Sequence, residues 1–276
     1  MAPIVHWHFD PIAIALGPLQ IHWYGLCWGL AFLAAEFGVR RRLAAMGRSD
    51  VDVAGLVICA LLGTIAGARL AHCLFYDPAY YLAHPLRILA IWEGGMASHG
   101  GAVGLVAAVA WGAPRYAPGL APLTLLDAAA PSAAIGGAII RVANFLNSEI
   151  VGNPTSGHWG VVFDAVDPLP RHPVQLYEAA AYVLVFGVLH LVARRDRTLA
   201  RRGELTGLFL VLVFSARAVI ETWKTPQAAY EAGQLFTVGQ WLSVPFVLLG
   251  LVLLVRARRA RGAASARVAA AAGRAE

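Results

Sequence analysis

The chain has 276 residues, of which 59% are hydrophobic and only 14% are charged, and its formal net charge is +6. Soluble domains carry about 25% charged residues, so the composition excludes an ordinary soluble protein. Its apolar runs lack the strict alternation of polar and apolar residues found in outer-membrane barrels, which excludes that class too. We therefore predict an all-α, polytopic integral membrane protein.

Seven apolar segments are long enough to cross a bilayer, whose hydrocarbon core of about 30 Å needs roughly 20 helical residues. They cover residues 19–39, 51–76, 88–112, 123–146, 173–193, 205–222 and 238–255. These segments predict a single transmembrane domain over residues 1–255. The remaining segment, 256–276, is rich in alanine and arginine and predicts a basic, disordered tail.

Basic residues are distributed unevenly over the loops between these segments. Sixteen lie on the side of the C-terminus, whereas the other side carries three, Arg87, Arg171 and Lys224. Because cytoplasmic loops carry the excess of arginine and lysine, the N-terminus is predicted outside and the C-terminus in the cytoplasm. The same topology explains the positive net charge by contact with anionic inner-leaflet lipid rather than by nucleic-acid binding.

Cysteine and metal chemistry have no sequence support. Cys27, Cys59 and Cys73 each lie in an apolar segment, with neither a C-x-x-C pair nor metal-ligand spacing. We interpret them as packing residues. Any chemistry must therefore come from polar residues inside the spans.

Three arginines, Arg69, Arg141 and Arg217, lie within the predicted spans. A charged side chain at the bilayer centre costs about 2.5–3.5 kcal/mol or more, so such residues are either functional or held in ion pairs between helices. The predicted topology places all three toward the outer leaflet. Since a guanidinium offers two parallel N–H donors to a phosphate and keeps its charge, this arrangement predicts binding of a phospholipid headgroup or another lipid-borne anion.

Two polar stripes accompany these arginines. Arg141, Asn144, Ser148 and Glu149 have the spacing i, i+3, i+7 and i+8, which places them on one helix face. A second stripe on the sixth span consists of Arg217, Glu221 and Lys224, at i, i+4 and i+7. Both stripes are expected to point into the helix bundle.

His99 lies in the third span between two glycine pairs, in the segment EGGMASHGG (93–101). Histidine is the side chain best suited to general-base catalysis near neutral pH, so His99 is the strongest base candidate within a span. A histidine satisfied in the helix interior is the alternative. The glycines would allow a backbone or a ligand to approach closely.

The order of the polar motifs resembles that of the prolipoprotein diacylglyceryl transferase family of the bacterial inner membrane, over nearly the whole chain. The matching motifs are HWYG (22–25), GARLAHCLFY (67–76), WEGGMASHGG (92–101), Asp127 with Pro131, RVANFLNSEIVG (141–152), LPRHPVQLYEA (169–179) and RAVIETWKTP (217–226). The resemblance implies seven helices, a small periplasmic head at about 148–172 and a lateral opening for lipid.

The resemblance also implies an activity. The family transfers the diacylglyceryl group of phosphatidylglycerol to the lipobox cysteine in the signal peptide of a preprolipoprotein, and glycerol phosphate is released. Phosphatidylglycerol, the signal peptide and membrane lipid are therefore the expected partners, and no metal or other cofactor is expected.

Site residues follow from the same resemblance. Arg141 and Arg217 would hold the phosphate, and His99 would take the thiol proton, unless the phospholipid itself activates the thiol. The residues expected to bind or orient substrate are Tyr24, Arg69, Asn144, Asn147, Glu149, Gly152, His172, Glu178 and Glu221.

The sequence departs from the family pattern at five positions. Ile140, Ala143 and Ser148 stand where glycines are usual, Val213 replaces a tyrosine and Lys224 replaces an arginine. A divergent paralogue that binds phospholipid or lipoprotein without transfer therefore remains an alternative. A transporter with polar stripes along its pathway is a second alternative, although the chain shows no inverted repeats.

Overall fold

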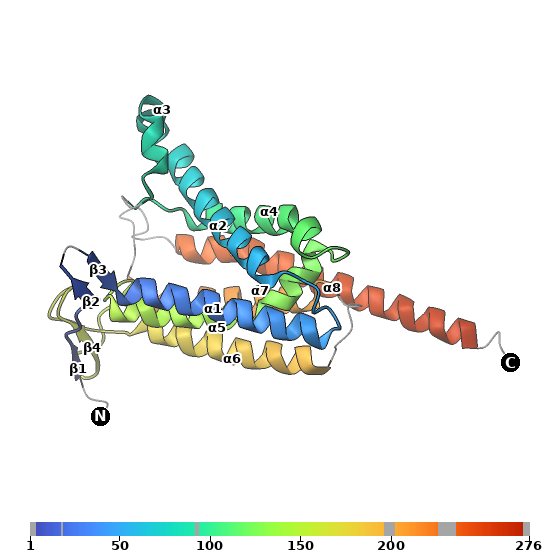
Figure 1. The fold of residues 1–276 in the computed structure, drawn as a ribbon. Coiled ribbons are helices and arrows are strands. Elements are labelled where there is room, and N and C mark those ends of the chain that lie inside the picture. The colour runs from blue at the N-terminus through green and yellow to red at the C-terminus, as the bar shows by residue number, and fades with distance from the viewer. Residues whose placement is uncertain (1–3, 18, 92–93, 196–201, 226–235, 273–276) are drawn as a thin grey trace. The chain divides into compact units, whose positions relative to one another are not determined.

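The computed structural model describes residues 4–17, 19–91, 94–195, 202–225 and 236–272 (Figure 1). Trp92 and Glu93 of the third predicted span, the loop residues Arg197 and Arg201, Pro226 and the last four tail residues lie outside the described residues. The chain forms two compact units, Met1–Gly38 with Leu126–Glu276, and Val39–Leu125. Each unit is described by itself.

Helices make up most of the described chain, which confirms the prediction of a mostly helical protein. They are α1 (Trp23–Ala45), α2 (Val53–Phe75), α3 (Pro78–Ala83), α4 (Ser98–Tyr116), α5 (Pro122–Leu146), α6 (Val174–Arg195), α7 (Glu204–Ile220) and α8 (Val238–Ala272), with 3-10 helices η1 (Pro85–Leu89) and η3 (Glu221–Trp223). Among the described residues, five helical segments are long and apolar enough to cross a membrane: α2, α5, α6, α7 with η3, and the first part of α8.

Two of the seven predicted spans begin at least four residues later than expected. Residues 19–22 form a strand, so α1 begins at Trp23 rather than at residue 19. The third span was predicted from residue 88, but α4 begins only at Ser98, because Gly94 and Gly95 have φ angles of +83° and +71° that no helix continues. At the other end of the chain, the backbone of α8 is helical as far as Ala272, through much of the segment for which a disordered tail was predicted.

The expectation of a purely α-helical chain was incomplete, because the described residues also form five short strands. β1 (Ile4–Trp7) pairs in parallel with β4 (Gly160–Phe163), which pairs antiparallel with β5 (Pro170–Arg171). β2 (Ile12–Leu16) and β3 (Leu19–His22) form a separate hairpin. Phe145 at the end of α5 packs with Val161 and Phe163 of β4, so the larger sheet covers one end of this helix.

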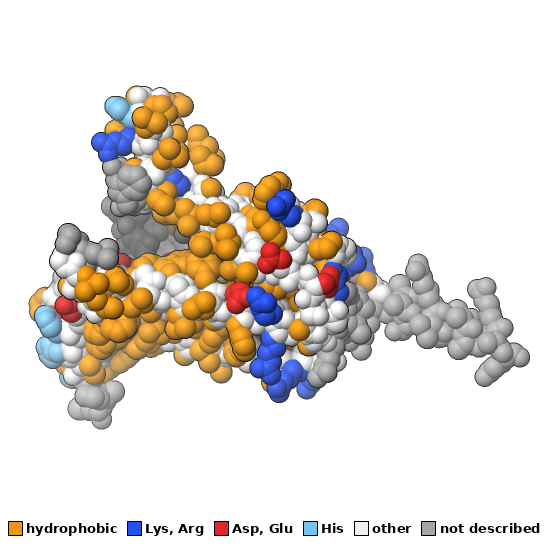
Figure 2. All heavy atoms as spheres, viewed as in Figure 1, with side chains coloured by type: hydrophobic (Ala, Val, Ile, Leu, Met, Phe, Trp, Pro, Cys, Tyr) orange, Lys and Arg blue, Asp and Glu red, His pale blue; other side chains and the backbone are white. Residues whose placement is uncertain are grey.

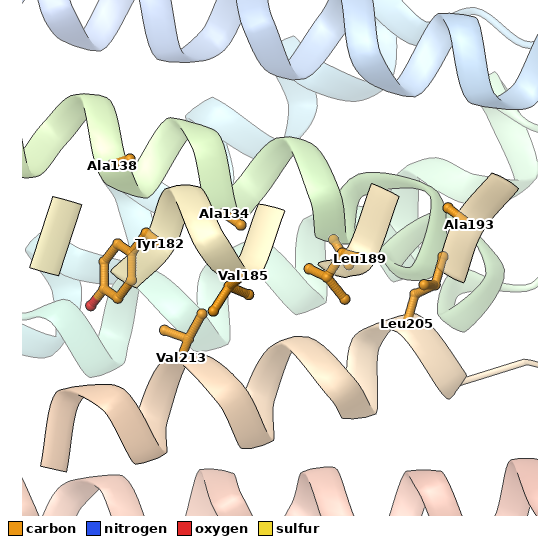
Figure 3. Close-up of a cluster of buried hydrophobic side chains, with 9 residues drawn as sticks. Ala134, Ala138, Tyr182, Val185, Leu189, Ala193, Leu205 and Val213 are labelled. Carbon is orange, nitrogen blue, oxygen red and sulfur yellow. The ribbon is translucent and has the colours of Figure 1, made fainter. Parts of the chain in front are cut away.

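Small residues on α5 bring three helices of the larger unit together. Ala130, Ala134 and Ala138 recur every four residues and pack in one cluster with side chains of α6 and α7. Figure 3 shows Ala134 and Ala138 on the side of α5 that faces this cluster. A Cβ atom on Gly137 would lie 3.1 Å from the Tyr182 ring, so α6 approaches α5 closely. This packing fixes the register of α5, α6 and α7, which carry the candidate site.

Asp127 on α5 fixes the N-terminus of α7. Its Oδ1 accepts hydrogen bonds from the Thr206 backbone N–H at 2.8 Å and the Thr206 hydroxyl at 2.6 Å, and its Oδ2 accepts one from the Gly203 N–H. The first N–H groups of a helix lack intrahelical partners and favour a negative charge. Asp127 therefore caps a neighbouring helix and sets its position along α5.

Hydrophobic side chains cover the flank of the α1, α5 and α6 layer (Figure 2). α1 begins directly after β3, α6 follows β5 after two intervening residues, and the last turn of α6 carries Arg194 and Arg195. The larger unit thus has one basic end and one end built from strands and loops.

In the smaller unit, α2 and α4 cross at glycines. A Cβ atom on Gly67 would lie 2.4 Å from the Gly100 carbonyl oxygen, and one on Gly104 would lie 2.1 Å from the Gly63 carbonyl oxygen. Any side chain at these positions would push the two backbones apart. The glycines therefore determine where the first turn of α4, with His99, lies on α2.

Candidate active site

One buried carboxylate organises the polar cluster of the larger unit. Glu178 on α6 is completely buried, and its Oε2 lies 3.1 Å from Nε of Arg141 on α5. Its Oε1 lies 3.0 Å from Nζ of Lys224, directly after η3, and 3.7 Å from Nη1 of Arg217 on α7. Glu178 thereby connects a cation of α5 with two cations from the end of α7 and the residue after η3.

The cluster carries an excess of positive charge. Lys224 also contacts Glu221, with 3.0 Å between Nζ and Oε2, so three cations face two carboxylates. The Lys224 side chain is 5% exposed, whereas those of Arg141 and Arg217 are 17% and 30% exposed. The two arginines are therefore the cations of the cluster that remain open to a ligand, and the uncompensated charge favours an anion.

A chain of amide contacts extends from Arg141 to Glu149. Arg141 Nη1 donates to Asn144 Oδ1 at 3.2 Å, and Asn144 Nδ2 donates to Glu149 Oε2 at 3.1 Å. Asn147 Nδ2 donates to the other oxygen, Oε1, at 3.2 Å. The predicted helical stripe was wrong beyond Asn144, since α5 ends at Leu146 and a turn brings Glu149 back to the helix.

This turn holds two strained residues on either side of Glu149. Ser148 and Ile150 have φ angles of 55° and 54°, in the left-handed region that favours glycine. Strained backbone of this kind persists where surrounding contacts enforce it, often at functional sites. Here the turn places the Glu149 carboxylate within hydrogen-bonding distance of Asn144 and Asn147.

Replacing Ser148 with glycine is expected to stabilise the protein. A non-glycine residue in the left-handed region costs about 1–2 kcal/mol, of which glycine's greater unfolded-state freedom cancels part. We expect a gain of about 1 kcal/mol, or about 2–4 °C in the unfolding midpoint in detergent. Ser148→Ala is the matched control and should give no gain, because alanine bears the same backbone cost; equal gains from both variants would contradict this account.

Gly152 joins three backbone segments beside the cluster. Its N–H donates to the His172 carbonyl oxygen at 3.1 Å, and it pairs with Lys224 in an isolated bridge. A Cβ atom here would lie 2.5 Å from the His172 oxygen and 2.9 Å from the Trp223 oxygen. These backbone segments approach so closely that position 152 has no room for a side chain.

His172 lies between β5 and α6 among aromatic rings. Its Nδ1 is 3.2 Å from the Tyr177 hydroxyl, and its ring meets Trp159 edge-on with 4.9 Å between centroids. Burial lowers the pKa of His172 below its ordinary value, because the charged imidazolium loses hydration. At neutral pH the ring is therefore uncharged and can either donate to or accept from an incoming polar group.

Arg171 on β5 anchors the loop next to Gly152. Its Nη1 donates to the Gly152 carbonyl oxygen at 2.9 Å, and its Nε donates to Asp167 Oδ1 at 3.0 Å. The Arg171 guanidinium holds the pKa of Asp167 below its usual value, because it donates hydrogen bonds to the ionised carboxylate.

This pair predicts a pH-dependent part of the stability. Since the folded-state pKa of Asp167 is lowered, its contribution is fully present above the unfolded value of about 3.9 and is lost as pH falls through the folded value. The difference in unfolding free energy between the natural protein and Asp167→Asn should therefore shrink between pH 6 and pH 3. A difference that stays constant over this range would show that the carboxylate charge does not matter.

The other predicted site residues occupy two places. Tyr24 lies in the first turn of α1, half-buried, with its ring edge-on to Trp28 at 6.5 Å. His99 is the second residue of α4 and is exposed, and Arg69 on α2 is 3% exposed. These last two belong to the unit Val39–Leu125, whereas the arginine cluster belongs to the other unit.

Sequence reasoning did not select several residues of the cluster. Gln175 is completely buried and donates from Nε2 to the Glu149 carbonyl oxygen at 2.6 Å, and the Tyr182 hydroxyl interacts with Arg217. Gly239 on α8 leaves room for Glu221, whose Oε1 would lie 2.3 Å from an added Cβ. Gln175 could have been found, because it lies three residues before Glu178 on the same helix face.

Metal ligands do not gather in the described ranges: no group of three or more His, Cys, Asp or Glu side chains there could hold an ion. That the reaction needs no metal or other cofactor stays a prediction.

Comparison with known proteins identifies the family. The family model described as prolipoprotein diacylglyceryl transferase matches residues 11–256. The chain belongs to this family. A protein of Tolumonas auensis named phosphatidylglycerol–prolipoprotein diacylglyceryl transferase is 52% identical, over 91% of this chain and 97% of its own length. Proteins with the same name from Chloroherpeton thalassium and Nitrosomonas europaea are 42% and 40% identical, over 91% and 94% of this chain and 93% and 94% of their own lengths.

Proposed function

We propose that this chain is a phosphatidylglycerol–prolipoprotein diacylglyceryl transferase of the bacterial inner membrane. It transfers the diacylglyceryl group of phosphatidylglycerol to the lipobox cysteine of a preprolipoprotein signal peptide and releases glycerol phosphate. Within the structure, the observation that carries the proposal is the arginine pair beside Glu178, since two partly exposed cations on helices long and apolar enough to cross a membrane suit a lipid phosphate.

The reaction forms a bond between the cysteine sulfur and the diacylglycerol carbon that carries the phosphate. It breaks the bond between that carbon and the phosphate oxygen, and glycerol phosphate leaves. Negative charge therefore builds up on the departing phosphate. Arg141 and Arg217 bind this phosphate and stabilise the new charge, which preorganised cations do most effectively where water is excluded.

The thiol must lose its proton, because the thiolate is the nucleophile. His99 takes this proton, and its exposed place in the first turn of α4 leaves the imidazole accessible to a substrate. The amide and carboxylate groups of Asn144, Asn147 and Glu149 orient the polar part of the lipid. Tyr24, Gly152, His172 and Glu221 line or support the substrate site.

For the topology, we propose seven spans, with α1 and α4 completing the five more apolar segments. The N-terminus and the strand-containing head at 148–172 lie in the periplasm, and the C-terminus lies in the cytoplasm. Arg194 and Arg195 support this orientation, because they end α6 away from the strands.

The test is release of glycerol phosphate by the purified protein in detergent, with phosphatidylglycerol and a lipobox peptide. We expect release to require the peptide cysteine and to disappear when serine replaces it. Phosphatidylglycerol binding without release would favour a non-catalytic paralogue. Release that does not need the peptide would indicate a phospholipase instead.

A further inference from the structure

Arg69 uses its whole guanidinium to bind backbone. Its Nε donates to the Ile88 carbonyl oxygen at 2.9 Å, and its Nη2 donates to the Arg87 carbonyl oxygen at 2.6 Å. Its Nη1 donates to the carbonyl oxygens of Gly94 and Gly95. With all three nitrogens engaged and only 3% of the residue exposed, Arg69 differs from the partly open Arg141 and Arg217.

The four carbonyl groups come from two places. Arg87 and Ile88 lie in the last turn of η1, where the Arg87 carbonyl oxygen also accepts the Ala90 N–H at 3.1 Å and the negative end of the helix dipole favours a cation. Gly94 and Gly95 form a turn with positive φ angles directly before α4. The guanidinium also lies 5.2 Å from the centre of the Tyr81 ring, so the charge is covered from the α3 side.

The same stretch of α2 holds the chain on both sides of His99. The Ala97 N–H donates to the Ala68 carbonyl oxygen at 3.0 Å, next to Arg69. A Cβ atom on Gly100 would lie 2.4 Å from the Gly67 carbonyl oxygen, so the backbone after His99 touches α2 directly. His99 therefore projects from a segment that residues 67–69 hold at Gly94, Gly95, Ala97 and Gly100.

From these contacts, we propose that Arg69 is a positioning residue for His99 and not a ligand of the phosphate. This inference rests on the proposed function, in which His99 accepts the thiol proton. The guanidinium holds η1 and the Gly94–Gly95 turn in one arrangement, and this arrangement fixes the start of α4. Lysine cannot replace it, because a single ammonium cannot reach carbonyls from both places with the geometry of the planar fork.

Kinetics of Arg69→Lys in the full chain test the proposal. Displacement of a catalytic group by about 1 Å can cost about 100-fold, so we expect a loss of that order in kcat with the KM for phosphatidylglycerol unchanged. Adding Arg69→Lys to His99→Gln should cause little further loss, because both changes remove the same function. Arg115→Lys, an exposed arginine of the same unit, is the matched control and should behave as the natural protein.

Two results would overturn the proposal. A raised KM with unchanged kcat would mean that Arg69 binds the phosphate, and losses that multiply in the double variant would mean that it acts independently of His99. If Arg69→Lys does not fold, Tyr81→Leu is the second variant, because it keeps the guanidinium of Arg69 but removes the aromatic ring that lies over it. It should then lower kcat several-fold, again without an effect in the His99→Gln background; a full effect in that background would also contradict the proposal.

Hydrogen exchange separates this inference from the proposed function. Amides of residues 94–100 should exchange at least about 10-fold faster in Arg69→Lys than in the natural protein, since local opening becomes easier. Unchanged exchange would overturn the positioning role, whether or not the natural protein is active. Faster exchange together with an inactive natural protein would instead reject the transferase assignment and keep only the local contact.

Discussion

Arg217→Ala is expected to lower kcat for diacylglyceryl transfer by about 10²–10³-fold, the effect typical of removing one preorganised group from a developing negative charge. Arg217 is the most exposed cation of the cluster, with 30% of its side chain accessible, and its nearest carboxylate oxygen is 3.7 Å away. Of the three cations, it therefore has the guanidinium or ammonium group that is most accessible to a phosphate. Glycerol phosphate release under saturating lipid and peptide measures the effect.

Arg217→Lys separates charge from geometry. It keeps the charge but loses the two parallel donors, so it should recover only part of the lost rate. Arg141→Ala should lose similar activity and also stability, because Arg141 lies 3.1 Å from Glu178 and donates to Asn144. Activity of Arg217→Ala within about threefold of the natural protein, with Arg115→Ala as the exposed control, would remove Arg217 from the phosphate site.

Hydrophobicity and intramembrane charge were enough to select two cations that the structure brings together at Glu178. Arg141 and Arg217 stand out because a cation inside a span needs a partner, and the spacing of Arg217, Glu221 and Lys224 placed all three together. Lys224 and Glu221 are in contact, but α7 ends at Ile220 and Lys224 follows the 3-10 helix η3 with extended backbone. The predicted α-helical stripe was therefore wrong beyond Arg217, although these two side chains still meet.

Periodicity within one helix could not predict which residues of different helices are in contact. Glu178 was selected by resemblance, but its place at the centre of the cluster depends on how α5, α6 and α7 pack through Ala134, Ala138 and Tyr182. Helical periodicity gives the face of each helix but not the rotation or the register between two helices. Arg69 illustrates the same limit, since its partners are backbone carbonyls that no side-chain pattern reveals.

The strands were missed for a different reason. β4 is four residues long and buried at every position, so it lacks the polar alternation that marks a half-buried strand. β5 has only two residues, and its partner β4 is formed by residues 160–163. Segments this short acquire their structure from tertiary packing, here against Phe145, rather than from local preference.

Glu178→Gln is expected to cost about 3–5 kcal/mol of stability, as when one partner of a buried ion pair is removed. The variant keeps the shape of the side chain but leaves Arg141, Arg217 and Lys224 with Glu221 as the remaining carboxylate of the cluster. Glu221→Gln should cost less, because its side chain is 14% exposed and Glu178 still faces Lys224. Denaturant unfolding in detergent compares the two variants.

A second substitution that removes one cation tests whether the lost negative charge of Glu178 causes this destabilisation. Adding Lys224→Met to Glu178→Gln removes the most buried cation, so the double variant should be more stable than Glu178→Gln alone and give a coupling energy of about 1–3 kcal/mol. Its activity should stay low, because the arginines would still lack the carboxylate that sets their separation. If Lys224→Met instead destabilises Glu178→Gln further, Lys224 stabilises the fold by its packing rather than by its charge. If activity returns with stability, Glu178 serves only to neutralise Lys224, and the arginines hold their positions without it.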